Sequence, residues 1–292
     1  MMLRNYAICS EKQMRKCADA KMRRFINLHI YAFAHLRICT FSYLCKMRYF
    51  LQLSYNGTKY HGWQLQPNAV TVQEVLDKAL SLLCGHPVYT LGCGRTDAGV
   101  HASDFFAHFD TDFPIKEELI TNLNGILPKD IAAKRFIPVA DDAHARFDAN
   151  SRSYEYHMHF KKNPFKDDLS YYFNYRNKPS VELMNEGAKI ILEYDDFACF
   201  SKANADHFTT LCTITEAYWE INADESITFH ISANRFLRNM VRAIVGTLLD
   251  YGIGKINADD LRQIILNKNR SLAGTSVPGN GLYLTKISYP YL

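Results

Sequence analysis

Apolar and polar positions follow regular patterns from about residue 47 onward, and these patterns predict a succession of strands and helices. Segment 48–55, RYFLQLSY, alternates and is rich in aromatic residues, which is typical of a strand, and an Asn-Gly turn signal follows it. Thr71 and Glu74 have the spacing of a capping box, and apolar residues at helical spacing continue until Gly85. We therefore predict a strand at 48–55 and a helix between Thr71 and Gly85.

The same periodicities predict further elements along the chain. The longest predicted helix places six apolar residues, from Met240 to Leu249, on one face. Strands and helices that mix without strict βαβ alternation indicate an α+β fold with antiparallel sheets, in two similar halves that meet near residue 150. The predicted strands are 88–91, 104–109, 131–138, 153–160, 211–221, 226–232 and 282–288, and the further helices are 180–192, 236–251 and 257–266.

The first 46 residues have a different character. They hold nine Lys/Arg, two acids and four of the eight cysteines, without a capped helix or clean alternation. Polar and charged residues interrupt the apolar stretch 25–45, which argues against a membrane-spanning helix of about 20 residues. We interpret residues 1–46 as an extension upstream of an initiator at Met47, outside the fold, with a transit or signal peptide as the alternative.

Composition narrows the class of protein. A chain of 292 residues that is 48% hydrophobic and 22% charged can bury a core and is neither disordered nor collagen-like. The net charge is +4, but residues 47–292 hold 25 bases and 28 acids, so an anionic partner needs a local basic patch. Cys84, Cys93, Cys199 and Cys212 show no Cys-x-x-Cys pair and no zinc spacing, which predicts a reduced, cytosolic protein without a metal.

Segment 92–101, Gly-Cys-Gly-Arg-Thr-Asp-Ala-Gly-Val-His, is the densest functional signal in the chain. A dinucleotide-binding loop would need a third glycine where Asp97 stands, and a P-loop would need Gly-Lys-Ser/Thr. Arg95 close to Asp97 favours an ionised carboxylate, which is a candidate for chemistry. A tight turn in which Asp97 caps a neighbouring backbone group is the structural alternative.

The stretch from Gly94 to Ala102 resembles the signature of the TruA family of tRNA pseudouridine synthases. Further motifs of that family occur in the same order through residues 47–292, whereas residues 1–46 have no counterpart. These motifs are Tyr55–Gln64, Val72–Glu74, Asn124–Pro128, His144–Phe147 ahead of Tyr154, Phe236 with Asn239–Arg242, and Gly281–Leu284.

The resemblance implies an α+β isomerase of two similar halves, 47–150 and 151–292. Each half would be an antiparallel sheet with helices on one face, and the active-site cleft would lie between them. The enzyme would convert uridine to pseudouridine at positions 38, 39 and 40 of the tRNA anticodon arm, without a cofactor or metal. The resemblance also implies a cytoplasmic homodimer that binds tRNA and no membrane.

The resemblance assigns roles to five residues. The nucleophilic aspartate falls on Asp97, and the arginine that pairs with it falls on Arg242. The tyrosine that stacks on the target base falls on Tyr154, where its hydroxyl is a candidate for assisting proton removal. An arginine that contacts the RNA backbone falls on Arg95, and the apolar floor of the pocket falls on Leu282.

Simpler interpretations stand beside these roles. A tyrosine in a strand pattern often only packs, an arginine four residues after another on a helix is commonly solvated, and the histidines fit packing positions. Candidates for phosphate contacts, interleaved with aromatic residues, are Arg146, Arg152, Lys161, Lys162, Arg235, Arg238 and Arg270.

Two other function classes are open. A catalytically silent RNA-binding protein on the same fold would be favoured by loss of Asp97 or Arg242, and both are present. A carboxylate-dependent glycosidase would need a second acid roughly 5 to 10 Å from the first. The nearby Asp104 and Asp110 fit strand-surface positions instead.

Overall fold

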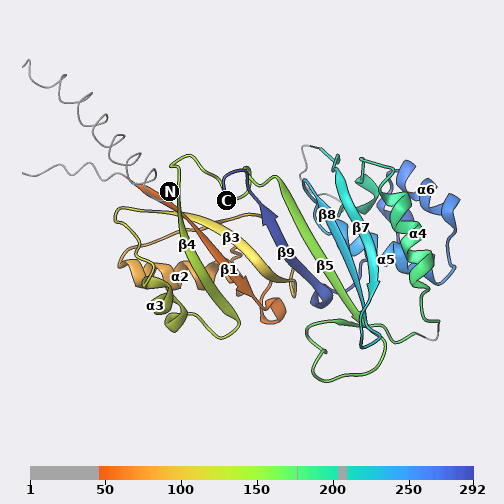
Figure 1. Ribbon diagram of the computed structural model, residues 1–292, viewed down its shortest axis with the longest axis horizontal. Coiled ribbons are helices and arrows are strands. Elements are labelled where there is room, and N and C mark those ends of the chain that lie inside the picture. Colours follow the sequence, from red (N-terminus) through yellow and green to blue (C-terminus); the bar gives the residue numbers. More distant parts are fainter. Residues whose placement is uncertain (1–45, 176, 203–208) are drawn as a thin grey trace, which may run out of the picture. The chain divides into compact units, whose positions relative to one another are not determined.

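The computed structural model describes residues 46–175, 177–202 and 209–292 (Figure 1). The interpretation of the N-terminal extension therefore falls outside the described residues, apart from Lys46.

Within these residues, nine strands form one mixed sheet (Figure 1). The long strands lie in the order β4-β1-β3-β9-β5-β8-β7, while β2 pairs with β3 and β6 pairs with β5. The strands are β1 (Met47–Tyr55), β2 (Leu91–Gly92), β3 (His101–Thr111), β4 (Ile131–Val139), β5 (Ser151–His159), β6 (Tyr171–Tyr172), β7 (Ile214–Ile221), β8 (Ile227–Ala233) and β9 (Leu282–Ser288).

The sheet consists of two antiparallel blocks that join at its centre. Strands β4, β1 and β3 form the first block, and β9, β5, β8 and β7 form the second. The blocks meet where β3 runs parallel to β9, with His101 opposite Tyr283 and Ala102 opposite Leu284. The α+β class is thus confirmed, with one shared sheet in place of two separate ones. The division of the chain at residue 150 stays a prediction.

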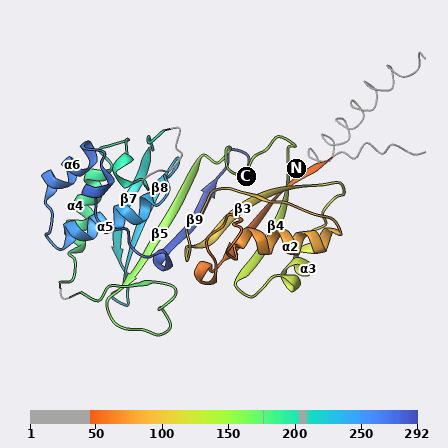
Figure 2. The same ribbon diagram turned by 180° about the vertical axis from the view of Figure 1, so that it is seen from behind.

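Helices cover one face of this sheet (Figure 2). In the described part of the chain these are α2 (Val72–Cys84), α3 (Leu119–Ile126), α4 (Val181–Ile191), α5 (Met240–Gly252) and α6 (Ala258–Leu266). Helices α2 and α3 pack on the first block, and α4 and α5 on the second (Figure 2). Each group buries its apolar face against strands, because a one-sided helix and a one-sided sheet must cover each other.

Two hydrophobic cores result, one under each block. The first contains Leu51, Leu80 and Phe105, and the second contains Phe229 and Ile244, all at 0% exposure. Burial of one such side chain stabilises the fold by about 1.5 to 3 kcal/mol. Tyr154 packs against both cores, so its strand β5 lies where they meet.

Local signals explain the ends of the best predicted helices. The Thr71 hydroxyl accepts the Glu74 N–H at 3.3 Å, and Gly85 ends α2 with φ 74°. The other half of the predicted capping box does not form, because the Glu74 carboxylate accepts from Lys78 instead. A complete capping box starts α6, where Asn257 and the third helical residue exchange hydrogen bonds.

Several predicted boundaries are wrong for physical reasons. Helix α5 begins at Met240 rather than at residue 236, because Asn239 adopts a left-handed conformation with φ 67° that a helix cannot continue through. The predicted strand 88–91 shrinks to Leu91–Gly92. Helix α3 is absent from the prediction, since it lacks a side-chain cap and buries only Leu123.

Candidate active site

The loop at residues 93–100, here called the Asp97 loop, connects β2 to β3 and is held by backbone hydrogen bonds. The Trp63 N–H donates to the Thr96 carbonyl at 3.3 Å, and the Gly99 N–H donates to the Tyr60 carbonyl at 3.2 Å. Gly99 has φ 74°, which glycine adopts without strain. Segment 57–63 therefore fixes the path of the Asp97 loop.

Two glycines permit this close approach. A Cβ at Gly57 would lie 2.0 Å from the Val100 carbonyl oxygen, and one at Gly62 would lie 2.2 Å from that of Thr96. Both glycines belong to the motif at residues 55–64, so their identity is explained by contact with the loop.

The structure brings Asp97 and Arg242 together, although they are 145 residues apart in the chain. Nη1 of Arg242 donates to Oδ2 of Asp97 at 3.0 Å, and both side chains are about a quarter exposed, at 22% and 27%. Nε of the same guanidinium donates to the Val277 carbonyl at 2.7 Å, while the Val277 N–H donates back to the Arg242 carbonyl at 3.2 Å. The Arg242 guanidinium thus donates both to a carboxylate and to a backbone carbonyl, and these two hydrogen bonds set its orientation.

The carbonyl that orients Arg242 belongs to segment 273–277, here called the α5 strap. A Cβ at Gly246 of α5 would lie 1.8 Å from the Thr275 carbonyl oxygen, so the strap rests directly on the helix backbone. The Gly274 N–H donates to the Thr247 hydroxyl at 2.9 Å in the same contact. Sequence reasoning missed this element, for which the two small residues, Gly246 and Gly274, were the available signal.

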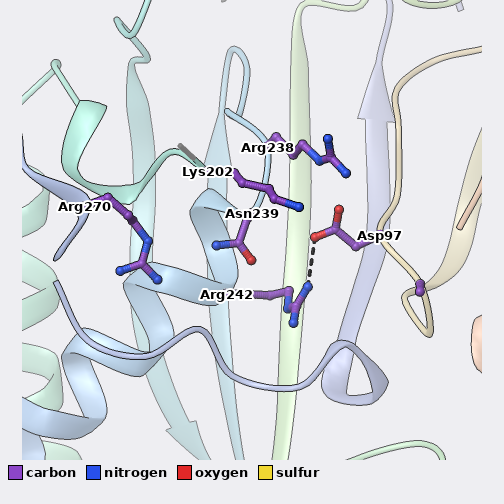
Figure 3. Close-up of a pocket in the computed structure, with 7 residues that line it drawn as sticks. Asp97, Lys202, Arg238, Asn239, Arg242 and Arg270 are labelled. Carbon is purple, nitrogen blue, oxygen red and sulfur yellow. Dashed lines mark hydrogen bonds and ion pairs between the residues drawn. The ribbon is translucent and has the colours of Figure 1, made fainter. Parts of the chain in front are cut away.

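A cavity of about 580 Å³ opens beside the ion pair (Figure 3). Its lining contains four cationic side chains and a single carboxylate, and the residues come from the Asp97 loop, α5 and neighbouring loops. They are Asp97, Ala98, Lys202, Arg238, Asn239, Arg242 and Arg270.

The Arg270 side chain forms hydrogen bonds with the α5 strap. Its guanidinium donates to the Ala273 carbonyl at 3.4 Å, to the Gly274 carbonyl at 3.0 Å and to the Ser276 hydroxyl at 2.8 Å. The Asn239 amide donates to the same hydroxyl at 2.6 Å. The structure thus uses Arg270 to shape the cavity wall, whereas its sequence context predicts a phosphate contact.

Tyr154 is half-buried on β5 and packs edge-to-face against Phe236, with ring centroids 5.1 Å apart. Burial, reinforced by the nearby Cys93, raises the pKa of its phenol well above the usual value. The hydroxyl is therefore protonated at neutral pH and is a poor base, which disfavours the proton-removal role considered for it.

The other two predicted site residues, like Tyr154, lie outside the cavity lining. Leu282 is 6% exposed at the start of β9, in the core of the second block. Arg95 is exposed on the Asp97 loop, in a group of four arginines. Burial lowers the pKa of Arg146 in this group, and the charges of Arg95, Arg152 and Arg235 lower it further.

Arg152 links the start of the Asp97 loop to residues 146–149 and to the residue that follows β8. Its guanidinium donates to the carbonyls of Cys93 at 3.0 Å, Arg146 at 2.7 Å, Ala149 at 3.3 Å and Asn234 at 3.1 Å. Four hydrogen bonds to backbone carbonyls indicate that Arg152 positions the backbone around the loop, whereas the sequence predicts a phosphate contact for it.

His101 holds the other end of the loop and is 1% exposed. Its Nδ1 accepts the Gly57 N–H at 3.1 Å, which assigns the proton to Nε2, 3.2 Å from the Asn280 carbonyl. Burial lowers the pKa of this imidazole, so the ring is neutral, and it stacks on Tyr283 at 4.5 Å. The predicted structural role of His101 agrees with these contacts.

The positions of the acidic residues near the cavity test the glycosidase alternative. Asp97 is its sole carboxylate among the described lining residues, while Asp104 accepts from Gln52 and Asp110 pairs with Arg48 on the sheet. A second acid in the place that a glycosidase requires is therefore missing from this lining. Across the part of the chain that the structure covers, we find no cluster of three metal-ligating side chains and no helix long and apolar enough to cross a membrane.

Comparisons with known proteins point in one direction. Residues 194–290 match a family model described as tRNA pseudouridine synthase. The chain is 49% identical over 245 residues to tRNA pseudouridine synthase A of Parabacteroides distasonis, covering 83% of this chain and 96% of the relative. The protein of that name from Porphyromonas gingivalis is 49% identical over 247 residues, with 83% and 97% covered. That from Bacillus subtilis is 41% identical over 249 residues, with 83% and 99% covered.

Proposed function

Because this chain belongs to the tRNA pseudouridine synthase A family, whose members are isomerases, we propose that it acts on uridines 38, 39 and 40 of the tRNA anticodon stem-loop, with Asp97 as nucleophile. The observation that carries this proposal is the 3.0 Å pair between Asp97 and Arg242 at the wall of an open cavity. The guanidinium compensates the charge of the carboxylate and aims it, while leaving one oxygen for a substrate.

The proposed reaction needs no co-reactant. A carboxylate oxygen of Asp97 forms a bond to ribose C1′ or to uracil C6, and the bond between C1′ and N1 breaks. The base then turns so that C5 bonds to C1′, and the bond to Asp97 breaks. C5 loses its proton and N1 gains one, so the product has the same atoms as the substrate.

Supporting roles fall on three further residues. Tyr154 presents an aromatic face for the flipped uracil, with a neutral hydroxyl that donates or relays a hydrogen bond. Leu282 supplies apolar surface beneath the pocket, and the exposed Arg95 reaches the RNA backbone. The family resemblance further supports a cytoplasmic homodimer that holds one tRNA across both subunits.

The test is tritium release from tRNA labelled at C5 of uridine, with the full chain and its Asp97→Asn variant. We expect release by the wild type and none by the variant, with tRNA binding nearly unchanged. Asp104→Asn is the matched control, because it removes a nearby carboxylate charge outside the cavity lining. Mapping pseudouridine in the product tests positions 38 to 40. Tight tRNA binding without release by the wild type would indicate the silent RNA-binding protein instead.

A further inference from the structure

Among the residues that the structure describes, two of the four cationic side chains around the cavity have no partner in the protein. Arg242 is bonded to Asp97 and Val277, and Arg270 is bonded to the strap. Lys202 and Arg238 are both exposed, and among the described residues neither side chain has a carboxylate or hydrogen-bond partner. Free cations beside a catalytic carboxylate call for an anionic ligand.

The backbone holds these two cations side by side. The Lys202 backbone N–H donates to the Arg238 carbonyl at 3.1 Å. This hydrogen bond holds the backbone at Lys202 against the residues that precede α5. Figure 3 shows both side chains extending into the cavity toward Asp97, on the side away from Arg242. Lys202 and Arg238 together are here called the cation pair.

The charge of a nucleotide resides in its phosphates, since uracil and ribose are neutral at physiological pH. Around Asp97, the Arg242 charge is already balanced, so the uncompensated positive charge of the exposed cation pair faces the space a nucleotide would enter. We propose that Lys202 and Arg238 form a binding subsite for the phosphodiester that flanks the target uridine. This subsite rests on the proposed function, because it assumes that the cavity receives a nucleotide of RNA.

The subsite has a defined effect on the reaction. A flipped nucleotide leaves its stack, and a fixed phosphate beside it would place C1′ and the base at a set distance from the carboxylate. The cation pair would act in binding and registration and would not take part in bond making. Its loss should therefore weaken RNA binding by more than it slows the chemical step.

The experiment uses the full chain and a synthetic anticodon stem-loop RNA. Lys202→Gln/Arg238→Gln is compared with Lys78→Gln/Lys255→Gln, which removes two exposed lysines that pair with Glu74 and Asp250 outside the cavity. Binding is measured across salt concentrations. Because the pair neutralises one phosphate, we expect the slope of log affinity against log salt to fall in magnitude by about 0.7 to 0.9 in the first variant and hardly at all in the second.

A second measurement identifies the phosphate. Methylphosphonates replace, one at a time, the phosphates on either side of the target uridine. At one position the neutral group should weaken wild-type binding about tenfold and binding by the double variant less than twofold. Equal losses in both proteins at both positions, or equal salt slopes in the two double variants, would overturn the subsite.

These outcomes are separable from the proposed function. Turnover by the wild type tests pseudouridine formation, whereas the binding measurements read the subsite with no turnover required. If the wild type binds RNA and forms no pseudouridine, the proposed function is refuted. The salt slopes would still show whether the cation pair binds a phosphate. Single-turnover rates of the double variant at saturating enzyme should fall by less than its affinity for RNA does, and a fall in the rate that exceeds the fall in affinity would move the pair into the chemical machinery.

Discussion

The Asp97 loop and helix α5 each supply one partner of the central ion pair, and they are fixed in different ways. Backbone hydrogen bonds and the neutral imidazole of His101 hold the loop. Direct contact of the strap with the backbone of α5 holds the helix and Arg242. One side of the site therefore depends on a group that titrates, whereas the other depends on close packing and on guanidinium groups that stay charged.

The largest expected effect comes from breaking the pair itself. Arg242→Ala should lower kcat by roughly 10² to 10³, because Asp97 loses its only described cationic partner and its aim. Steady-state tritium release measures the effect. Arg262→Ala on α6, which breaks a surface pair with Glu193, is the control and should be close to wild type. A near-normal rate for Arg242→Ala would contradict the pairing role.

Packing on the α5 side is tested by Gly246→Ala. The added methyl group would meet the Thr275 carbonyl, so the strap must move and Arg242 loses its guide. We expect a loss of about 3 kcal/mol in the free energy of unfolding, measured in urea, together with lower activity. Gly125→Ala in α3 meets open space and should instead be neutral or stabilising by up to about 1 kcal/mol. Equal stability of the two variants would show that the strap is not tightly docked.

Acid should act on the loop side. His108 on β3 accepts the Ala145 N–H at 3.2 Å, and burial lowers its pKa from 6.5 to about 4. The unfolded chain binds this proton near pH 6.5 and the folded chain does not, so stability is complete above that pH and falls as the pH drops toward 4. The loss should reach about 3 kcal/mol.

Urea titrations at several pH values measure this loss. In His108→Gln, whose amide oxygen can still accept the same N–H, the dependence between pH 6.5 and 4 should shrink. Hydrogen exchange, corrected for intrinsic rates, should show loss of protection in residues 93–111 before α5. If residues 93–111 and α5 lost protection at the same pH, the two sides of the site would not differ in their sensitivity to acid.

Replacement of Arg152 should have the smallest effect on stability. Arg152→Met removes contacts to four carbonyls, three of them in residues 93–149, and we expect a loss of about 1 kcal/mol in stability because water replaces most of these contacts. Exchange of the Asp97 loop should quicken, with a lower kcat and little change in the salt dependence of tRNA binding. A reduced salt slope with an unchanged loop would restore the phosphate role suggested by the sequence.

The accuracy of sequence reasoning followed the range of the interaction. Thr71, Gly85 and Asn257 act on neighbours within one turn, and the helix ends they set were predicted well. The left-handed Asn239 carries no local signal of that kind, so the start of α5 was misplaced by four residues.

Long-range features were beyond local patterns. The joining of both blocks through β9, the docking of the α5 strap and the contacts of Arg152 with the Cys93 and Asn234 carbonyls each unite residues that are distant in the chain. The proximity of Asp97 and Arg242 was reached through family resemblance, because no periodicity relates two residues on a loop and a helix 145 positions apart. Arg238 was among the phosphate contacts predicted from the sequence, whereas Lys202 was missed because it shares no motif with Arg238.

The central position of β9 also constrains how the protein can be made. A ribosome delivers β3 and β5 well before β9, so each presents an unpaired edge until the final strand in the described chain order emerges. Pairing of β9 with β3 closes a loop of about 180 residues, a slow, non-local step in folding. The nascent chain is therefore exposed to edge-to-edge aggregation until β9 has been synthesised, and a chaperone that shields strand edges should raise its yield.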